Sequence, residues 1–315
     1  MLTKQSLDLP TITIITPSLN QGEYIRTTID SVFSQDYPAL EYQVRDGGST
    51  DQTLQILRSY GDKLCWFSEP DTGQSNAINK GWQKSQGDIV AWLNSDDYLC
   101  PGVLNQIGAY FRDHPEVDVL YGDCDIIDQA GKVLLSYPTQ PFDFANLVLS
   151  TVNYIPQPAT FIRKRVLENT GYLDESLDYV MDFDYWLRAG KEHRFAYIHE
   201  RLASLRTHDQ AKSIASLGKF GKELVHIYEQ FFDSPDLPEY IRSLKQRAMS
   251  NIYYRAADCS FWAGQLADAR RCAWKSWQFF PTRLRRLWFY LAIGKFGRNL
   301  AEKRFHNPYV IQIQN

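Results

Sequence analysis

The chain has 315 residues, 44% of them hydrophobic and 23% charged, which is the composition of a folded globular protein and excludes a disordered chain. Its length suffices for one large α/β domain with an appendage or for two modest domains. The five cysteines are odd in number and form no CxxC pair, which argues against a zinc ribbon or a disulfide framework and favours a reducing compartment. The net charge is −3, yet residues 271–304 hold nine Lys or Arg and one Glu, so the tail is basic and the body acidic.

Targeting and membrane signals are weak. The first ten residues lack the apolar core of a signal peptide, and no apolar run approaches the ~18 residues that a spanning helix needs. We therefore expect a cytoplasmic protein, with any membrane association peripheral and at the inner face of the cell membrane.

Short apolar segments alternate with helical patterns along the first half of the chain. The pattern predicts strands at residues 11–16, 41–44, 64–67, 89–93 and 117–121, and helices at 23–33, 53–60, 75–85 and 103–111. A hairpin is expected around Gln129-Ala130-Gly131, because glycine suits the left-handed position of a tight turn. This alternation predicts an α/β fold with a mainly parallel sheet flanked by helices.

The pattern changes near residue 212. Beyond it helical periodicity dominates, with breaks at Ser234-Pro235, Gly264, Pro281 and Gly294. We therefore predict an α/β domain over residues 1–212 and a helical C-terminal region over residues 213–315.

Polar segments follow four successive predicted strands. They read TPSLNQGEY, DGGSTD, EPDTGQSNAINKG and NSDD. In an open parallel sheet ligands bind at the carboxyl ends of the strands. The adjacent acids Asp96 and Asp97 repel each other unless a cation or a proton compensates them, so NSDD is either an exposed turn or a metal site. Four such segments at one edge favour a binding crevice.

Four stretches carry a family resemblance. The segments ITIITPSLNQGEYI, EYQVRDGGSTDQT, SNAINKGWQKSQGDIVAWLNSDD and YLDESLDYVMDFDYWLR resemble, in this order, the catalytic domain of glycosyltransferase family 2 over about residues 11–212. The resemblance implies a nucleotide-sugar-binding domain of the GT-A type. It also implies an inverting, metal-dependent transfer from a UDP- or GDP-sugar to a saccharide or lipid-linked acceptor in bacterial surface polysaccharide biosynthesis.

In this resemblance NSDD takes the place of the family's DxD motif, which binds a divalent cation on the donor diphosphate. Asp96 is the first candidate ligand, Asp97 the second, and His208 a further one by its position. Both Mn²⁺ and Mg²⁺ prefer oxygen ligands and are commonly held by one or two carboxylates together with substrate phosphates. Asn94 departs from the family pattern, and its amide is expected to touch the ribose or a metal-bound water.

The resemblance also implies a nucleotide pocket. Its expected residues are Thr16, Pro17, Ser18, Glu23, Asp46, Asn79, Asn94, Ser95 and Asp96. Asp46 is expected to read the base, although many relatives carry a second aspartate where this chain has Gly47.

Asp182 is the predicted general base. It aligns with the carboxylate that takes the acceptor's proton in the family, and positioned proton transfer contributes about 10²–10⁴-fold to the rate. The alternative is that Asp182 caps a helix over residues 183–189, and Asp184 has the same alternative.

The sequence leaves two questions open. Leu284, Leu287, Trp288 and Leu291 are spaced as one face of a basic helix that either binds an anionic membrane surface or packs on the rest of the chain. The acidic body makes nucleic acid an unexpected partner. A catalytically impaired nucleotide-sugar-binding module and a sugar-nucleotide pyrophosphorylase are the alternatives to a transferase, and the latter is disfavoured because TPSLNQGEY has no glycine-rich, lysine-containing phosphate loop.

Overall fold

The computed structural model describes residues 9–207, 216–281 and 293. The chain divides into two compact units, one of residues 1–142 and 154–207 and the other of residues 143–153 and 208–315. The predicted division at residue 212 falls outside the described residues and stays a prediction. The sequence pattern did not indicate that residues 143–153 belong to the second unit.

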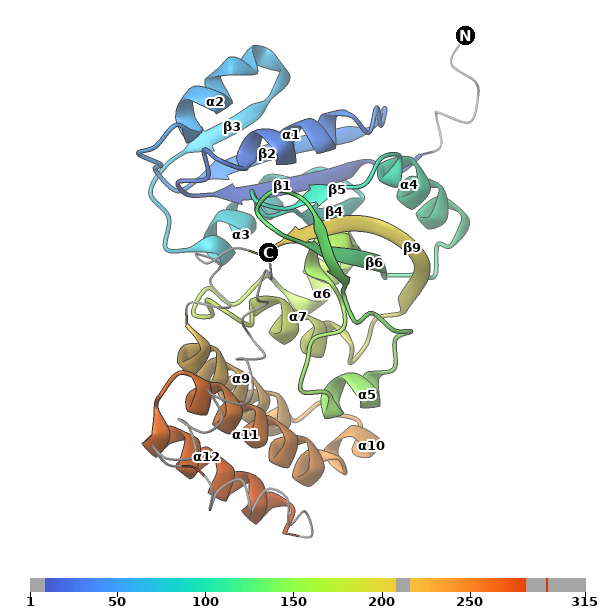
Figure 1. The fold of residues 1–315 in the computed structure, drawn as a ribbon. Coiled ribbons are helices and arrows are strands. Elements are labelled where there is room, and N and C mark those ends of the chain that lie inside the picture. Colours follow the sequence, from blue (N-terminus) through green and yellow to red (C-terminus); the bar gives the residue numbers. More distant parts are fainter. Residues whose placement is uncertain (1–8, 208–215, 282–292, 294–315) are drawn as a thin grey trace. The chain divides into compact units, whose positions relative to one another are not determined.

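The first unit alternates strands and helices along the chain (Figure 1). Its elements are β1 Ile12–Ser18, α1 Ile25–Phe33, β2 Leu40–Asp46, α2 Thr53–Ser59, β3 Cys65–Ser68, α3 Gln74–Lys84, β4 Ile89–Trp92, β5 Tyr98–Leu99, α4 Val103–Asp113, β6 Val119–Ile127, β7 Val133–Ser136, β8 Thr160–Arg163, α6 Lys164–Thr170, α7 Met181–Ala189 and β9 Phe195–Arg206. Every strand and helix predicted up to residue 121 is present, with bounds that differ by a few residues.

The strands form one sheet in the order β3-β2-β1-β4-β8-β6-β9-β5, with β7 paired to β6. The predicted parallel arrangement holds from β3 to β4, where Ser18 of β1 lies opposite Asp46 of β2. The rest of the sheet is mixed, because β8 runs antiparallel to both β4 and β6 and the β6–β7 hairpin is antiparallel. Gly131 in that hairpin has a φ of 87°, the left-handed conformation that was predicted for it.

Helices cover both faces of the parallel strands (Figure 1). Ile12 and Ile14 of β1 belong to a buried apolar cluster with residues of α1, α2 and α4. On the other face Ile15 touches α3 so closely that a Cβ on Gly81 would lie 2.7 Å from its Cδ1. Since β1 and β4 are buried along their whole length, their polar side chains can reach a ligand only near the strand ends.

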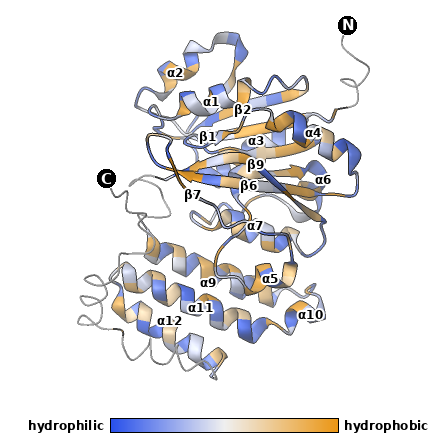
Figure 2. Cartoon of the chain, turned by 45° about the vertical axis from the view of Figure 1, so that its right-hand side comes forward, coloured by the Kyte–Doolittle hydropathy of each residue, from blue (hydrophilic) through white to orange (hydrophobic). Residues whose placement is uncertain are grey.

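The second unit is helical. Its elements are α5 Phe144–Leu149, α9 Leu217–Asp233, α10 Glu239–Arg242, α11 Lys245–Trp262 and α12 Leu266–Phe279. Hydrophobic and hydrophilic residues alternate along α9 and α11 (Figure 2), as expected for helices with one buried face. The segment with α5 belongs here because the Asn251 amide in α11 donates a hydrogen bond to the Leu149 carbonyl, at 2.7 Å.

Within the described residues, no helix combines the length and the apolarity that crossing a bilayer requires. The basic segment at residues 284–291 lies outside the described residues, so membrane binding and packing both stay predictions for it.

Candidate functional site

The ends of the parallel strands are joined by backbone hydrogen bonds into one continuous edge. Gly47, just after β2, donates its N–H to the Ser18 carbonyl of β1 at 2.8 Å. Glu69, just after β3, donates to the Asp46 carbonyl at 3.0 Å, and Leu93 after β4 donates to Ile15 at 3.0 Å. The polar segments that follow these strands therefore meet at one edge of the sheet, as their order in the sequence predicts.

The DGGSTD turn fixes the loop that follows β1. Ser49 accepts a hydrogen bond from the Asn20 N–H through Oγ at 2.7 Å, and Asp51 accepts one from the Gly22 N–H through Oδ2 at 2.9 Å. Burial tends to raise the pKa of Asp51, but hydrogen bonds from Thr53 and Gly22 outweigh it and lower the pKa below its ordinary value. Side chains of one strand-end segment thus hold the backbone of the next.

Asp46 is committed to its own turn. Its Oδ2 accepts hydrogen bonds from the N–H groups of Gly48 and Ser49 and from the Ser68 hydroxyl, at 3.1, 3.0 and 2.6 Å. Its Oδ1 accepts the Ser49 hydroxyl. The side chain is 2% exposed. Asp46 therefore lies at the predicted place, but the structure gives its carboxylate a structural role in shaping the turn.

The three residues expected from β1 lie in different environments. Thr16 is turned into the core, where its Oγ1 lies 3.1 Å from the Tyr42 hydroxyl, and Pro17 is buried beside it. Ser18, the last residue of the strand, is also buried, and its Oγ has no hydrogen-bond partner within the described part of the chain. Buried hydroxyls are normally paired, so Ser18 is the β1 residue best placed to meet a ligand.

Glu23 is exposed just before α1, and its carboxylate forms a hydrogen bond with the Tyr24 hydroxyl. Burial, followed by the charge of Glu23, raises the pKa of Tyr24, and the charge of Asp96 acts in the same direction. The Arg206 guanidinium lies over the Tyr24 ring, 5.0 Å from its centroid. The charges of Glu23, at the start of α1, and of Asp96, in the NSDD segment, therefore both act on Tyr24.

The two acids of NSDD differ in burial. Asp97 is 2% exposed, and its Oδ1 accepts the backbone N–H of Arg206 at 2.8 Å. Its Oδ2 accepts the Asn94 amide at 3.2 Å. Burial, and next the charge of Asp96, raises the pKa of Asp97 well above its usual range. Asp97 thus ties the turn after β4 to β9, whereas Asp96 is the partly exposed member of the pair.

Asn94 and Ser95 complete the segment. The side-chain oxygen Oδ1 of Asn94 accepts a hydrogen bond from the Gln74 side chain at 2.6 Å, and its Nδ2 donates to Asp97. The Asn94 side chain therefore connects α3 to the NSDD turn. Ser95 is buried, and its carbonyl accepts the Thr28 hydroxyl of α1 at 2.9 Å. Both residues lie where they were predicted, and both hold the turn that presents Asp96.

Arg206 is a residue that the motif analysis missed. Its Nε donates to the Asp96 carbonyl at 2.9 Å, and its Nη1 donates to the carbonyls of Asp128 and Gln129 at 2.9 and 2.7 Å. It therefore connects the NSDD turn to the β6–β7 hairpin. The sequence signal for Arg206 was its place at the end of the LASLR segment, two residues before His208. The predicted ligand His208 lies outside the described residues.

The residues present are compatible with a divalent cation, but they do not form a complete protein cage. Within residues 9–207 and 216–281, no group of three His, Cys, Asp or Glu side chains is suitably placed to hold an ion. Mg²⁺ and Mn²⁺ bound together with substrate phosphates need one or two carboxylates. Asp96 offers one such carboxylate. Asp97 and Asn94 already form hydrogen bonds within the protein, and these bonds hold the turn that carries Asp96.

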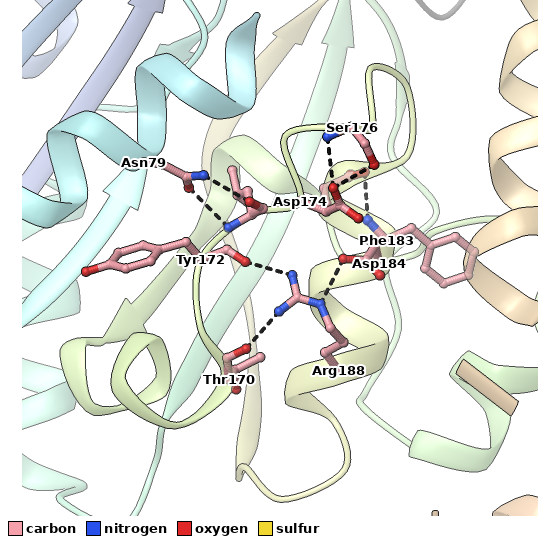
Figure 3. A network of polar contacts seen from close by, with 10 residues as sticks. Asn79, Thr170, Tyr172, Asp174, Ser176, Phe183, Asp184 and Arg188 are labelled. Carbon is pink, nitrogen blue, oxygen red and sulfur yellow. Dashed lines mark hydrogen bonds and ion pairs between the residues drawn. The ribbon is translucent and has the colours of Figure 1, made fainter. Parts of the chain in front are cut away.

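The two acids at the start of α7, Asp182 and Asp184, also differ in burial. Figure 3 shows the pair that the buried Asp184 forms with Arg188. The helix begins at Met181, two residues before the predicted start, so Asp182 lies in the first turn and its Oδ1 accepts the N–H of Phe183 at 2.8 Å. Asp184 is buried and pairs with Arg188, with Oδ2 and Nε 2.8 Å apart. Asp182 is the more exposed of the two, and its charge contributes, after burial, to raising the pKa of Tyr137.

Asn79 supports the loop before α7. Its amide donates to the Leu173 carbonyl at 2.9 Å and its Oδ1 accepts the Leu173 N–H at 3.1 Å (Figure 3). From the other side Arg188 donates to the carbonyls of Thr170 and Tyr172, each at 2.9 Å. The amide of Asn79 is 3% exposed and occupied by these bonds, so its geometry favours positioning of the Asp182 loop over contact with a nucleotide.

Comparisons with known proteins agree with this geometry. The family model described as glycosyl transferase family 2 matches residues 13–171. An uncharacterized glycosyltransferase of Rickettsia typhi is 31% identical over 223 residues, which is 69% of this chain and 70% of that protein. The O-antigen biosynthesis protein RfbC of Myxococcus xanthus is 31% identical over 190 residues, but the match covers only 14% of that protein.

Two solved structures share the fold. TarS of S. aureus, residues 1–349 in complex with UDP-GlcNAc, superposes with a TM-score of 0.64 at 18% identity, over 94% of this chain and 93% of that chain. The mannosyltransferase PcManGT of Pyrobaculum calidifontis, in complex with GDP-Man and Mn²⁺, gives a TM-score of 0.57 at 17% identity, over 95% of this chain and 88% of that chain. With the family match and the relatives, the GT-A fold completes the identification: the chain belongs to glycosyltransferase family 2 and is a glycosyltransferase.

Proposed function

We propose that this glycosyltransferase is an inverting enzyme that uses a UDP- or GDP-sugar donor together with Mn²⁺ or Mg²⁺. The observation that carries the proposal is the division between Asp96 and Asp97, in which the buried acid ties the turn after β4 to β9 and the other is presented at the edge of the sheet. The structural neighbours bound to UDP-GlcNAc and to GDP-Man with Mn²⁺ support the same donor class.

The residues around the edge have distinct tasks in this proposal. Asp96 holds the cation, while Arg206 and Thr28 fix the backbone on either side of its carboxylate. Ser18 meets the nucleotide through its buried hydroxyl, which has no hydrogen-bond partner among the described residues. When bound, the cation supplies positive charge against the departing diphosphate, a role worth several kcal/mol in such enzymes.

Asp182 acts as the general base. It takes the proton from the acceptor hydroxyl as that oxygen attacks the sugar carbon from the side opposite the diphosphate, which inverts the configuration. Asn79 and Arg188 hold the loop before α7 from two sides, so the position of Asp182 is fixed in advance. The buried Asp184 is a supporting residue because its carboxylate holds Arg188.

A transfer assay tests this proposal. The full chain is incubated with a panel of UDP- and GDP-sugars and saccharide acceptors, with Mn²⁺, with Mg²⁺ and with a chelator, and the anomeric configuration of the product is read by NMR. We expect metal-dependent transfer with inversion. Transfer that survives complete chelation would refute the metal requirement, and nucleotide-sugar binding without transfer to any acceptor would favour the impaired binding module.

The acceptor in this proposal is a lipid-linked saccharide at the inner face of the membrane. Its motivation is the basic, aromatic tail, where each basic residue near an anionic surface contributes on the order of 1 kcal/mol. Sedimentation with anionic and neutral vesicles compares the natural chain with a variant in which Arg283, Arg285 and Arg286 are changed to glutamine. We expect salt-sensitive binding to anionic vesicles that the variant loses, and equal sedimentation of the two proteins would contradict the membrane role.

A further inference from the structure

Asp46, the residue expected to read the nucleotide base, is buried and bonded within its own turn. Both oxygens of Asp46 accept hydrogen bonds within the turn and from Ser68, and the side chain is 2% exposed. Oδ2 accepts three of these hydrogen bonds and Oδ1 accepts the Ser49 hydroxyl, so the carboxylate is largely used within the protein and buried away from a ligand. If this enzyme selects a base through a carboxylate, a more accessible one is needed.

Asp71 occupies the space beside the turn that a longer side chain at position 47 would fill. A Cβ built on Gly47 would lie 2.6 Å from Oδ2 of Asp71, 3.1 Å from its Cγ and 3.3 Å from its Oδ1. Real Cβ atoms essentially never come within 3.0 Å of another atom, so a side chain at position 47 would displace the Asp71 carboxylate. An aspartate at position 47 is incompatible with Asp71 in its present place.

Asp71 is held at the edge and remains partly exposed. Its Oδ1 accepts the N–H of Gly73 at 2.9 Å, while Oδ2 is the atom nearest to Gly47. Gly47 in turn donates to the carbonyl of Ser18, whose buried hydroxyl has no partner within the described residues. Gly47 therefore lies between Ser18 and the partly exposed carboxylate of Asp71, at the ends of neighbouring strands.

We propose that Asp71, seated over Gly47, is the residue that selects the nucleotide base, and this inference rests on the proposed function. A carboxylate accepts hydrogen bonds and donates none. It therefore favours uracil and guanine, which present an imide or amide N–H on their pairing edge, over cytosine and adenine, which present a ring nitrogen acceptor there. A site built to hydrogen-bond one group rejects an analogue that leaves its polar atoms unpaired.

The test compares nucleoside diphosphates by calorimetry on the full chain, with UDP, GDP, CDP and ADP as probes. The natural protein should prefer UDP or GDP. In Asp71→Asn the affinity ratio of that nucleotide to CDP should fall about 10- to 100-fold, since a hydrogen bond to a charged group is lost and the new amide can donate to cytosine. The ratio should fall equally with and without Mn²⁺, which separates base reading from cation binding.

Two further variants sharpen the result. Asp62→Asn makes the same chemical change at an exposed position in the short turn after α2 and should leave the ratio unchanged. Gly47→Ala keeps the Asp71 carboxylate but forces it to move, so it should lower the same ratio and serves as the test if Asp71→Asn does not fold.

An affinity ratio that stays within about twofold of the natural value in both Asp71→Asn and Gly47→Ala would overturn the inference while leaving the proposed function intact. Failure of the natural protein to bind any of the four nucleotides would overturn the proposed function itself, and the inference with it.

Discussion

The turn at residues 46–51 and the segment at residues 94–97 both place acids at the end of a buried strand, and burial divides those acids in the same way. In the segment, Asp97 is buried and bonded to backbone while its neighbour Asp96 is partly exposed. At the turn, Asp46 is buried and bonded within the turn, and the partly exposed acid beside it is Asp71 from the next strand end. The Asp96–Asp97 pair can be recognised in the sequence because its members are adjacent. The Asp46–Asp71 pair cannot, because its members come from different strand ends.

The acids of α7 extend the comparison and give the largest expected effect. Asp182→Asn should lower turnover about 10²–10⁴-fold, because an amide cannot accept the acceptor's proton, while the affinity for the nucleotide sugar stays the same. Steady-state kinetics and calorimetry measure the two quantities. Asp184→Asn makes the same chemical change at the neighbouring buried acid. Its main effect should be a lower free energy of unfolding, because the pair with Arg188 is weakened. Natural turnover in a folded Asp182→Asn protein would rule out its role as base.

The next effect concerns the turn. Asp46→Ala should lower the free energy of unfolding by about 3 kcal/mol, because several donors lose a buried acceptor. Asp71→Ala should cost less than about 1 kcal/mol, since one hydrogen bond is lost at a partly exposed site. Urea unfolding of both variants measures the contrast. Equal losses would mean that burial does not separate the roles of these acids.

A smaller contrast is expected at NSDD. Asp97→Ala should lower the free energy of unfolding by about 2 kcal/mol, because the Arg206 N–H and the Asn94 amide lose their acceptor. Asp96→Ala should change it by no more than about 0.5 kcal/mol and should abolish the Mn²⁺-dependent gain in affinity for UDP or GDP. Calorimetry with and without Mn²⁺ checks the second part. If Asp96→Ala keeps the metal effect, the cation is held elsewhere.

The smallest effect is a pH dependence of the stability contributed by Asp51, which accepts the Gly22 N–H in the loop after β1. The folded-state pKa of Asp51 is lowered, so its contribution to stability is present above the unfolded-state pKa, about 3.9, and is lost as the pH falls through the folded-state value. Asp51→Asn should therefore be less stable than the natural protein near neutral pH, and the difference should shrink below about pH 4. Urea unfolding over this range tests it, and a constant difference at every pH would contradict the assigned direction.

The elements around the site follow from local pattern. The run from Thr11 to Thr16 predicted a strand because β-branched and apolar side chains fit a buried sheet, and the predicted helices carry apolar residues at helical spacing. The mixed half of the sheet could not be predicted in this way. Whether β8 pairs parallel or antiparallel depends on the path of the chain between elements, which periodicity does not encode.

The sequence predicted the position of the candidate site but not the contacts of each residue in it. The strand-end motifs predicted the edge at which polar segments gather, yet Asn79 and Asp46 make structural contacts there in addition to any predicted nucleotide contact. Motifs do not identify Arg206 and Asp71, because each lies against a segment that is far away in the sequence. Motif spacing identifies residues near a strand end, but it does not tell which of them points inward.

The sequence by itself determined the alternation of strands and helices, the edge at which polar segments gather and the family resemblance, because hydrophobic period and short motifs are local properties of the chain. The tertiary structure decided which carboxylates are available. Availability depends on burial and on donors supplied by distant segments, as when the backbone N–H of Arg206 occupies Asp97 and the Ser68 hydroxyl occupies Asp46. Those donors come within hydrogen-bonding distance only after β9 and β3 have joined the sheet.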